Sequence, residues 1–313
     1  MFGVEFFVAF EAVLTVVILI AIGYALTFKG KITKEISSFI SWLVVNISLP
    51  CLMASTIATS FSRAEIAGIP KAVLLPMVTI LICYGAGYII AKITKPKKER
   101  FGQVIVQTAQ NNTIFMGLPV NIAMLGEVSV PYVLYYYMAN TILFWTLGVY
   151  LISGKKSEKG ALKHILSVVF SPPIYGLMAG LICLFFDIAI PKFAMDTIKY
   201  VGALTTPLSM FFIGYALCSA GLKNIKIDKD IIVGLISRLG VGPAISIAIF
   251  SLFNLPQLMM NVFTIQSFMP VMANAAIVAE SHDSDTEYAA VMISISTIIT
   301  LFLLPLVKVL FIH

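Results

Sequence analysis

The chain alternates between long apolar runs and short polar connections. Because a membrane-spanning helix needs about 20 mainly apolar residues, this pattern predicts ten helices that cross a bilayer. The predicted spans are residues 6–28, 36–57, 70–91, 101–126, 130–153, 165–186, 197–219, 231–253, 257–280 and 287–311. The connections between them are too short to hold a separate soluble domain. The expected fold class is therefore an all-α polytopic membrane protein.

The ten predicted spans divide into two halves of five, residues 1–153 and 165–313. Since five is an odd number, the second half enters the membrane from the opposite side, and any repeat between the halves is inverted, as in many secondary transporters. Prolines fall at corresponding places in the two halves. Pro50 in span two matches Pro207 in span seven, and Pro119 in span four matches Pro270 in span nine. A chance alignment of prolines in apolar sequence is the alternative.

Pro119 and Pro270 lie in the middle of their spans. A proline inside a helix removes one hydrogen bond and clashes with the carbonyl four residues earlier, and Gly117 adds backbone freedom just before Pro119. Spans four and nine are therefore expected to form two half-helices each, with the second half starting near the proline. Two helix N-termini that meet at the midplane would form an anion site. Two simple proline kinks are the alternative.

Polar side chains flank both predicted breaks. They are Gln103, Gln107, Gln110, Asn111, Asn112 and Thr113 in span four, Asn140 in span five, and Gln266, Ser267 and Asn274 in span nine. Amides that face lipid would be costly, so these side chains are expected to face the protein interior or a cavity. Hydrogen bonding between helices is the alternative for any single one of them. As a set, they predict a polar site.

Composition narrows the class of protein. Hydrophobic residues make up 59% of the chain and charged residues 12%, against roughly 25% charged residues in ordinary soluble domains. This excludes a soluble enzyme, a nucleic-acid-binding domain and a disordered scaffold. The sequence shows no metal-ligand cluster, nucleophile–base pair or phosphate loop at a plausible depth. We therefore expect no enzymatic activity, no catalytic residues, no cofactor, no metal site and no nucleic-acid partner.

The distribution of charge predicts the orientation. Lysine and arginine concentrate in the odd-numbered connections, and the positive-inside rule then places those connections in the cytoplasm and both termini outside. The connection from Glu280 to Glu287 disagrees, because it is acidic and contains neither lysine nor arginine. Acidic residues carry little weight in the rule, so the topology is kept. The expected location is the plasma (cell inner) membrane.

Arg238 is the one charge well inside a predicted span. Its side chain could snorkel toward the cytoplasm, since Lys and Arg bury their stems while the charged head reaches water. It could also form a structural ion pair, with Glu280 as the candidate partner, or attract anions to an inner vestibule. The sequence alone leaves these three possibilities open.

Several segments resemble the auxin efflux carrier family, which includes the plant PIN carriers and bacterial permeases for malate and malonate. The segment NTIFMGLP, from Asn112 to Pro119, is similar to the family signature N-T-x-x-M-G-x-P. RLGVGPA, from Arg238 to Ala244, resembles the PIN pattern R-F-L-T-G-P-A. Gln266 and Pro270 fit Q-x-x-x-P, and Asn140 stands where PIN carriers have a glutamine.

The resemblance implies a fold like that of the bile-acid symporters, with broken helices four and nine that cross at their breaks. It also implies a homodimer, a scaffold of spans one, two, six and seven, and a moving transport domain of spans three to five and eight to ten. The substrate carboxylate would bind near Asn112. The long hydrophilic loop of many PIN carriers is missing here, and Met53 stands near a PIN serine. Both departures favour a prokaryotic-type carrier of small organic anions.

The combined prediction is a secondary transporter of small carboxylates such as malate, malonate or auxin-like acids, working by elevator-type alternating access. Asn112 and Asn140 would hydrogen-bond the substrate, Gln266 would line the crossover, and Gly117, Pro119 and Pro270 would shape it. One alternative is a sodium- or proton-coupled symporter or antiporter on the same fold. The other is a membrane sensor that binds an anion without moving it.

Overall fold

The computed structural model describes residues 2–60, 69–153, 172–219, 221, 227–272, 274–281 and 284–312. Its helices in the first half are α1 (Phe2–Phe28), α2 (Lys34–Leu43), η1 (Val44–Ser48), α3 (Leu49–Ser60), α5 (Ile69–Thr94), η2 (Lys98–Arg100), α6 (Phe101–Ala109), η3 (Thr113–Gly117), α7 (Leu118–Leu125), η4 (Glu127–Ser129), α8 (Val130–Leu143), η5 (Phe144–Gly148) and α9 (Val149–Ser153). Those in the second half are α11 (Pro172–Phe185), α12 (Lys192–Ala203), α13 (Thr205–Ser219), α14 (Lys229–Ile236), η7 (Ser237–Val241), α15 (Gly242–Phe250), α16 (Gln257–Ser267), α17 (Asn274–Ser281) and α18 (Thr286–Phe311).

Helices make up most of the described part of every predicted span, and no strand occurs among the described residues. The start of predicted span six, residues 165–171, lies outside them. Within the part of the chain that the structure describes, five helical stretches are long and apolar enough to cross a membrane: Lys34–Thr59, Ala72–Thr94, Lys192–Ser219, Lys229–Phe250 and Thr286–Phe311. The described residues are all-helical, as predicted, and are consistent with a polytopic membrane protein, whereas ten spans in two inverted repeats stay a prediction.

Prolines are accommodated by wide π-helical turns. The turns η1, η3 and η7 each end two residues before a proline, namely Pro50, Pro119 and Pro243. Proline lacks an N–H and clashes with the carbonyl four residues back. A π-turn shifts the hydrogen bond to the carbonyl five residues back, so these helices continue through their prolines.

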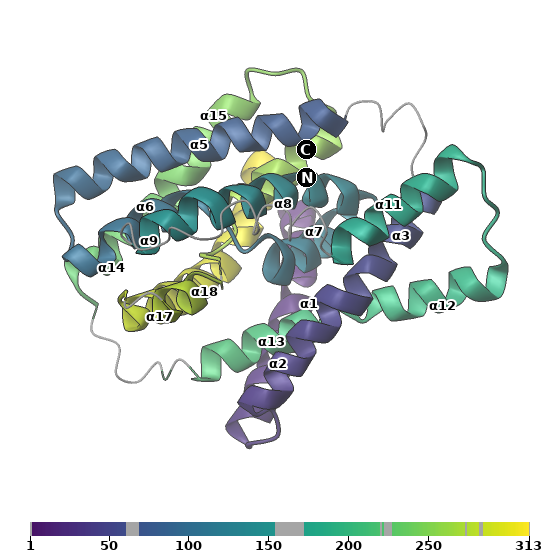
Figure 1. Cartoon of the computed structure of the whole chain (residues 1–313), viewed down its shortest axis with the longest axis horizontal. Coiled ribbons are helices and arrows are strands. Elements are labelled where there is room, and N and C mark those ends of the chain that lie inside the picture. Colours follow the sequence, from purple (N-terminus) through teal and green to yellow (C-terminus); the bar gives the residue numbers. More distant parts are fainter. Residues whose placement is uncertain are drawn as a thin grey trace.

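The helices form two groups (Figure 1). In one group, at the lower right of the view, α1 packs along α13, and α3 packs along α11 and α12. In the other, α5 packs against α6, α8 and α15, and α14 and α16 contact α18. Helix α7 contacts α1 and α13, so the segment that follows the break in span four touches the first group.

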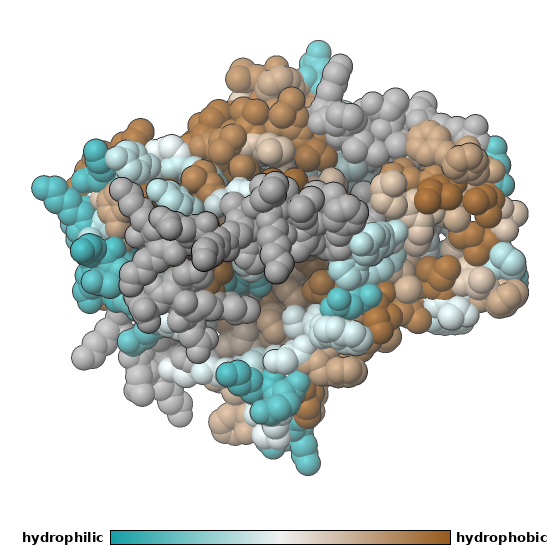
Figure 2. Space-filling view, in the orientation of Figure 1, coloured by the Kyte–Doolittle hydropathy of each residue, from teal (hydrophilic) through white to brown (hydrophobic). Residues whose placement is uncertain are grey.

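The surface is consistent with a membrane location. Figure 2 shows hydrophobic residues covering the face over α5 and α15 and the face near α3 and α12, while hydrophilic residues gather at the left edge and at the bottom of the view. Large apolar side chains are exposed on the outer faces, including Ile89 on α5, Tyr200 on α12 and Phe302 on α18. Among the described residues, the buried asparagine and glutamine side chains lie instead in spans four, five and nine.

Candidate functional site

Two broken helices cross at the centre of the second helix group. Helix α6 ends at Ala109 and α16 ends at Ser267, and the extended segments that follow them pair in antiparallel fashion through Asn111 and Val271. The Asn112 N–H donates to the Pro270 carbonyl at 2.9 Å. The chain becomes helical again at Thr113 in η3 and at Asn274 in α17. Each span therefore consists of two half-helices, as the sequence predicts.

The break in span four lies earlier than the sequence indicates. Residues Gln110–Asn112 are extended, whereas Gly117 and Pro119 lie within the following helix, with Pro119 in the first turn of α7. The prediction that the second half-helix starts near the proline is therefore wrong for span four. Pairing of the Asn111–Asn112 main chain with residues 270–271 defines the break, and the π-turn η3 accommodates the proline. In span nine, α17 starts four residues after Pro270.

Asn111 is the centre of the hydrogen bonds at the crossover. Its Nδ2 donates to the Tyr136 hydroxyl at 3.1 Å and to the Gln266 carbonyl. The Asn140 amide holds its main chain: Asn140 Oδ1 accepts from the Asn111 N–H at 3.2 Å, and Asn140 Nδ2 donates to the Asn111 carbonyl at 3.0 Å. The structure places Asn111 in the extended segment that follows α6, beyond Gln103 and Gln107, which lie within that helix. Asn140 is fully buried beside Asn111.

Gln266 packs directly against Gly117. Its Nε2 donates to the Thr113 carbonyl at 3.4 Å, while its Oε1 has no hydrogen-bond partner in the described part of the chain. A Cβ atom added at Gly117 would lie only 2.4 Å from that Oε1. The glycine thus permits a close approach of the Gln266 side chain between the two broken spans, and its own backbone is not left-handed.

Asn112 is at the N-terminus of η3, where the helix dipole is positive. It is 3% exposed, and its Nδ2 has no hydrogen-bond partner among the described residues. Buried amide donors are normally satisfied by protein or ordered water. An unpaired donor beside a helix N-terminus is therefore suited to an anionic ligand.

Arg238 is completely buried next to the same crossover. Its Nη1 donates to the Thr108 carbonyl at 3.1 Å and to Asn111 Oδ1 at 3.0 Å, and its Nη2 donates to the Ser267 carbonyl. With 1% exposure, the side chain does not snorkel toward the cytoplasm, so that interpretation is wrong. The Glu280 side chain, the candidate partner for an ion pair, lies outside the described residues.

A cavity of about 640 Å³ opens between the two helix groups. Its wall on one side comes from α2, η1 and α13, and on the other from η3, α17 and α18. Phe115 and Phe212 stack across this boundary with ring centroids 4.6 Å apart. Asn274, the first residue of α17, also lines the cavity. The cavity therefore reaches the starts of both helices that follow the breaks.

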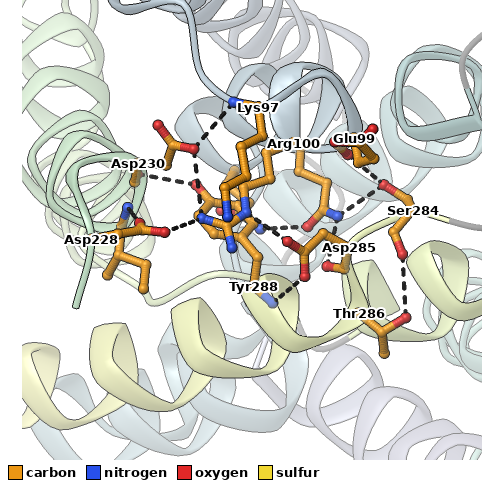
Figure 3. A network of polar contacts seen from close by, with 12 residues as sticks. Lys97, Glu99, Arg100, Asp228, Asp230, Ser284, Asp285, Thr286 and Tyr288 are labelled. Atoms are coloured by element: carbon orange, nitrogen blue, oxygen red, sulfur yellow. Dashed lines mark hydrogen bonds and ion pairs between the residues drawn. The ribbon is translucent and has the colours of Figure 1, made fainter. Parts of the chain in front are cut away.

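A cluster of ion pairs joins three connections at one end of the second helix group (Figure 3). Arg100 pairs with Asp228 at 2.5 Å, with Asp285 at 2.6 Å and with Asp230 at 3.5 Å, and its guanidinium lies 4.8 Å from the centre of the Tyr288 ring. Gln103 Nε2 bonds Ser284 Oγ at 2.9 Å. The acidic ninth connection, which disagreed with the charge rule, thus lies on the same side of the protein as the basic third connection.

Mutual pairing sets the charge states in this cluster. Burial raises the pKa of Asp228, but the hydrogen bond and charge of Arg100 and the Ile231 N–H outweigh it and hold the pKa below its usual value. Desolvation lowers the pKa of Arg100, while its bonds to Asp285 and Asp228 raise it above the ordinary value. Arg100 and Asp228 therefore form an ionised pair near neutral pH.

Some residues of the site were not identified from the sequence. No local pattern in the sequence distinguishes Asn111 from Asn112 or from the other amides near the break. Trp42, Asn46 and Ser294 line the cavity but lie far from the breaks in sequence. The predicted residues Asn112, Asn140, Gln266, Gly117 and Pro270 do come together at the crossover, while Pro119 lies in the first turn of α7.

The all-helical architecture and its long apolar helices are consistent with a polytopic membrane protein. The sequence matches the family described as membrane transport protein over residues 8–308, and the chain belongs to that family. It is 29% identical to an uncharacterized transporter of Methanocaldococcus jannaschii over 95% of this chain and 96% of that protein. It is also 29% identical to an uncharacterized transporter of Methanothermobacter thermautotrophicus, with the same coverage. An uncharacterized transporter of Saccharomyces cerevisiae is 29% identical over 40% of this chain and 29% of its own length.

Proposed function

We propose that this membrane transporter is a secondary carrier of small organic anions, of the chemical class of malate, malonate and auxin-like carboxylates. The observation that carries the proposal is the buried crossover, which combines two helix N-termini, the unpaired amide of Asn112 and the positive charge of Arg238. Helix N-termini and oriented N–H groups favour anions. A cation substrate would find no carboxylate among the described contacts of this crossover.

The proposed roles follow from the contacts of each residue. Asn112 donates its free Nδ2 to the substrate carboxylate. Asn140 lies within hydrogen-bonding distance of the same segment and keeps its main chain in place. Gln266 lines the crossover, and Gly117 lets it approach. Pro270 supplies the carbonyl that fixes Asn112, and Pro119 shapes the following helix.

Alternating access would move one helix group relative to the other. The packing supports two inverted repeats of five spans: α1 against α13 corresponds to α11 against α3, and α5 against α6 corresponds to α15 against α16. We propose that spans one, two, six and seven form the scaffold, and that spans three to five and eight to ten move as the transport domain. The cavity between the groups would then be the vestibule through which the substrate reaches the crossover.

The membrane arrangement is proposed on the same basis. Pairing of Arg100 with Asp228 and Asp285 brings the third, seventh and ninth connections to one side. The excess of lysine in the odd connections favours the cytoplasm for that side, with both termini outside and the protein in the plasma membrane. A homodimer, implied by the family resemblance, would be formed through the scaffold.

The test is uptake of radiolabelled malate into proteoliposomes that contain the purified protein, followed by competition with unlabelled malonate, acetate and an aromatic monocarboxylate. Saturable uptake that a carboxylate competes away would support the proposal. A folded protein that neither transports nor exchanges any acid of the panel would contradict it. Saturable binding without flux would instead indicate the sensor.

A further inference from the structure

The guanidinium of Arg238 lies at the negative ends of two half-helices. Thr108 is in the last turn of α6 and Ser267 is the last residue of α16, and the carbonyls of both accept hydrogen bonds from Arg238. Carbonyls in a last helical turn have no partner within their own helix. In the broken helices of transporters, such half-helix C-termini and unwound carbonyls are where a coupling Na⁺ is coordinated.

We infer that Arg238 takes the place of a coupling cation, so that the crossover carries a built-in positive charge and transport needs no sodium. This deepens the proposed function, because it states how the same site is charged and coupled.

The charges at the crossover support this inference. Each helix C-terminus carries about half a negative charge, so two of them match the single charge of one guanidinium. Asn111 Oδ1 supplies a third oxygen at 3.0 Å from Nη1. The guanidinium of Arg238, which belongs to η7 in span eight, therefore contacts three oxygens from spans four and nine. A diffusible cation in the same position would have to displace the guanidinium from all three.

Through its contact with Asn111, Arg238 lies close enough to Asn112 for its positive charge to stabilise a bound anion. Asn111 accepts from Arg238, and the neighbouring residue Asn112 has the unpaired Nδ2 at the start of η3. The fixed positive charge thus lies behind the segment that would hold the carboxylate. Bringing an anion into a low-dielectric site is costly unless an opposite charge is nearby, and Arg238 provides that charge in every state of the protein.

The experiment measures cation binding by thermal unfolding, so it does not depend on knowing the substrate. The midpoint of the purified protein is recorded in NaCl and in choline chloride at equal ionic strength. A ligand that binds only the folded state raises the midpoint. We expect equal midpoints for the unaltered protein, and an increase specific to Na⁺ would overturn the inference.

The Arg238→Ala variant provides the second arm. Removing the side chain leaves carbonyls without a donor and space for a small cation. Addition of NaCl or ethylguanidinium chloride, but not of choline chloride, is expected to raise its midpoint by about 2–4 °C. A variant that neither cation stabilises would contradict the inference.

If the alanine variant cannot be purified, the effect of the charge at position 238 is tested with Arg238→Lys and Arg238→Met. The two side chains have similar length and differ in charge. The lysine variant is expected to have the higher midpoint and to remain insensitive to Na⁺. A methionine variant as stable as the lysine variant would overturn the inference, whereas a failure to transport malate in the assay above would leave this result unaffected.

Discussion

The side-chain amide of Asn140 brackets the main chain of Asn111. Its Oδ1 accepts from the Asn111 N–H at 3.2 Å and its Nδ2 donates to the Asn111 carbonyl at 3.0 Å. The amide thus replaces the two hydrogen bonds that a neighbouring strand would supply to this extended residue. Both groups are buried, so they require a partner. Span five is thereby attached to the break in span four.

Replacement of Asn140 by leucine should weaken both the fold and transport. The substitution keeps roughly the same volume but leaves two buried main-chain groups of Asn111 unpaired, which costs about 1–3 kcal/mol for each group. The thermal midpoint is expected to fall, and carboxylate uptake to fall at least about tenfold, since that corresponds to only about 1.4 kcal/mol. Thr146→Val in the same span is the control, because its hydroxyl bonds only within its own helix. Equal thermal midpoints and equal uptake for the two variants would contradict a role of Asn140 in holding the Asn111 main chain.

Gly117→Ala should disturb the crossover through Gln266. The new methyl group would meet Gln266 Oε1 at 2.4 Å, so the buried amide would have to move. We expect lower flux and a lower thermal midpoint, and a smaller penalty for the same change in a Gln266→Ala background, with a coupling of about 0.5–3 kcal/mol. Gly85→Ala is the matched control, because nothing lies within 4 Å of its added Cβ. A helical glycine-to-alanine change in open space should be neutral or stabilising.

The Arg100 cluster predicts a defined dependence of stability on pH. The pKa of Asp228 is lowered in the folded state, mainly because Arg100 outweighs the effect of burial. Its contribution is therefore present above the unfolded pKa of about 3.9 and is lost as the pH falls through the lower folded value. The thermal midpoint of the unaltered protein should decrease below about pH 4.

Arg100→Gln should reverse that dependence. Without the guanidinium, the carboxylates of Asp228, Asp230 and Asp285 lose their shared positive partner and repel one another as like charges. The variant should be clearly less stable than the unaltered protein at pH 7 and should gain stability as the pH falls toward about 4. Thermal unfolding of both proteins between about pH 4 and pH 7 measures how the midpoint of each changes with pH. Parallel pH profiles for the two proteins would contradict the predicted reversal.

A fixed charge at Arg238 predicts how transport responds to voltage. A transport domain loaded with a monocarboxylate carries no net charge in its crossover, whereas the empty domain carries one positive charge. Exchange between two loaded states should therefore be insensitive to membrane potential, while net uptake should change, since one charge moved across 100 mV corresponds to about 2.3 kcal/mol. Exchange and net flux of acetate at zero and 100 mV distinguish these cases. Voltage-sensitive exchange would contradict the assignment.

The sequence predicted the helices well because each apolar run is long and strongly patterned. It also predicted that both broken helices and their buried amides would lie in spans four and nine, where amides and prolines interrupt the apolar sequence. It misplaced the break in span four, since the break depends on main-chain pairing between Asn111 and Val271, which are 160 residues apart in sequence. The partners of Arg238 and Arg100 were missed for the same reason: their contacts are brought together only by the fold.

The central claim is that Asn112 presents a free amide to an anionic substrate. The most direct measurement is labelled carboxylate uptake together with thermal unfolding for Asn112→Ala, with the exposed Asn254→Ala as control. Because Asn112 Nδ2 has no partner among the described residues, removing it should leave the midpoint within about 1 °C of the unaltered value. Uptake should fall at least about tenfold, the equivalent of about 1.4 kcal/mol. Normal uptake by the Asn112→Ala protein would contradict the account.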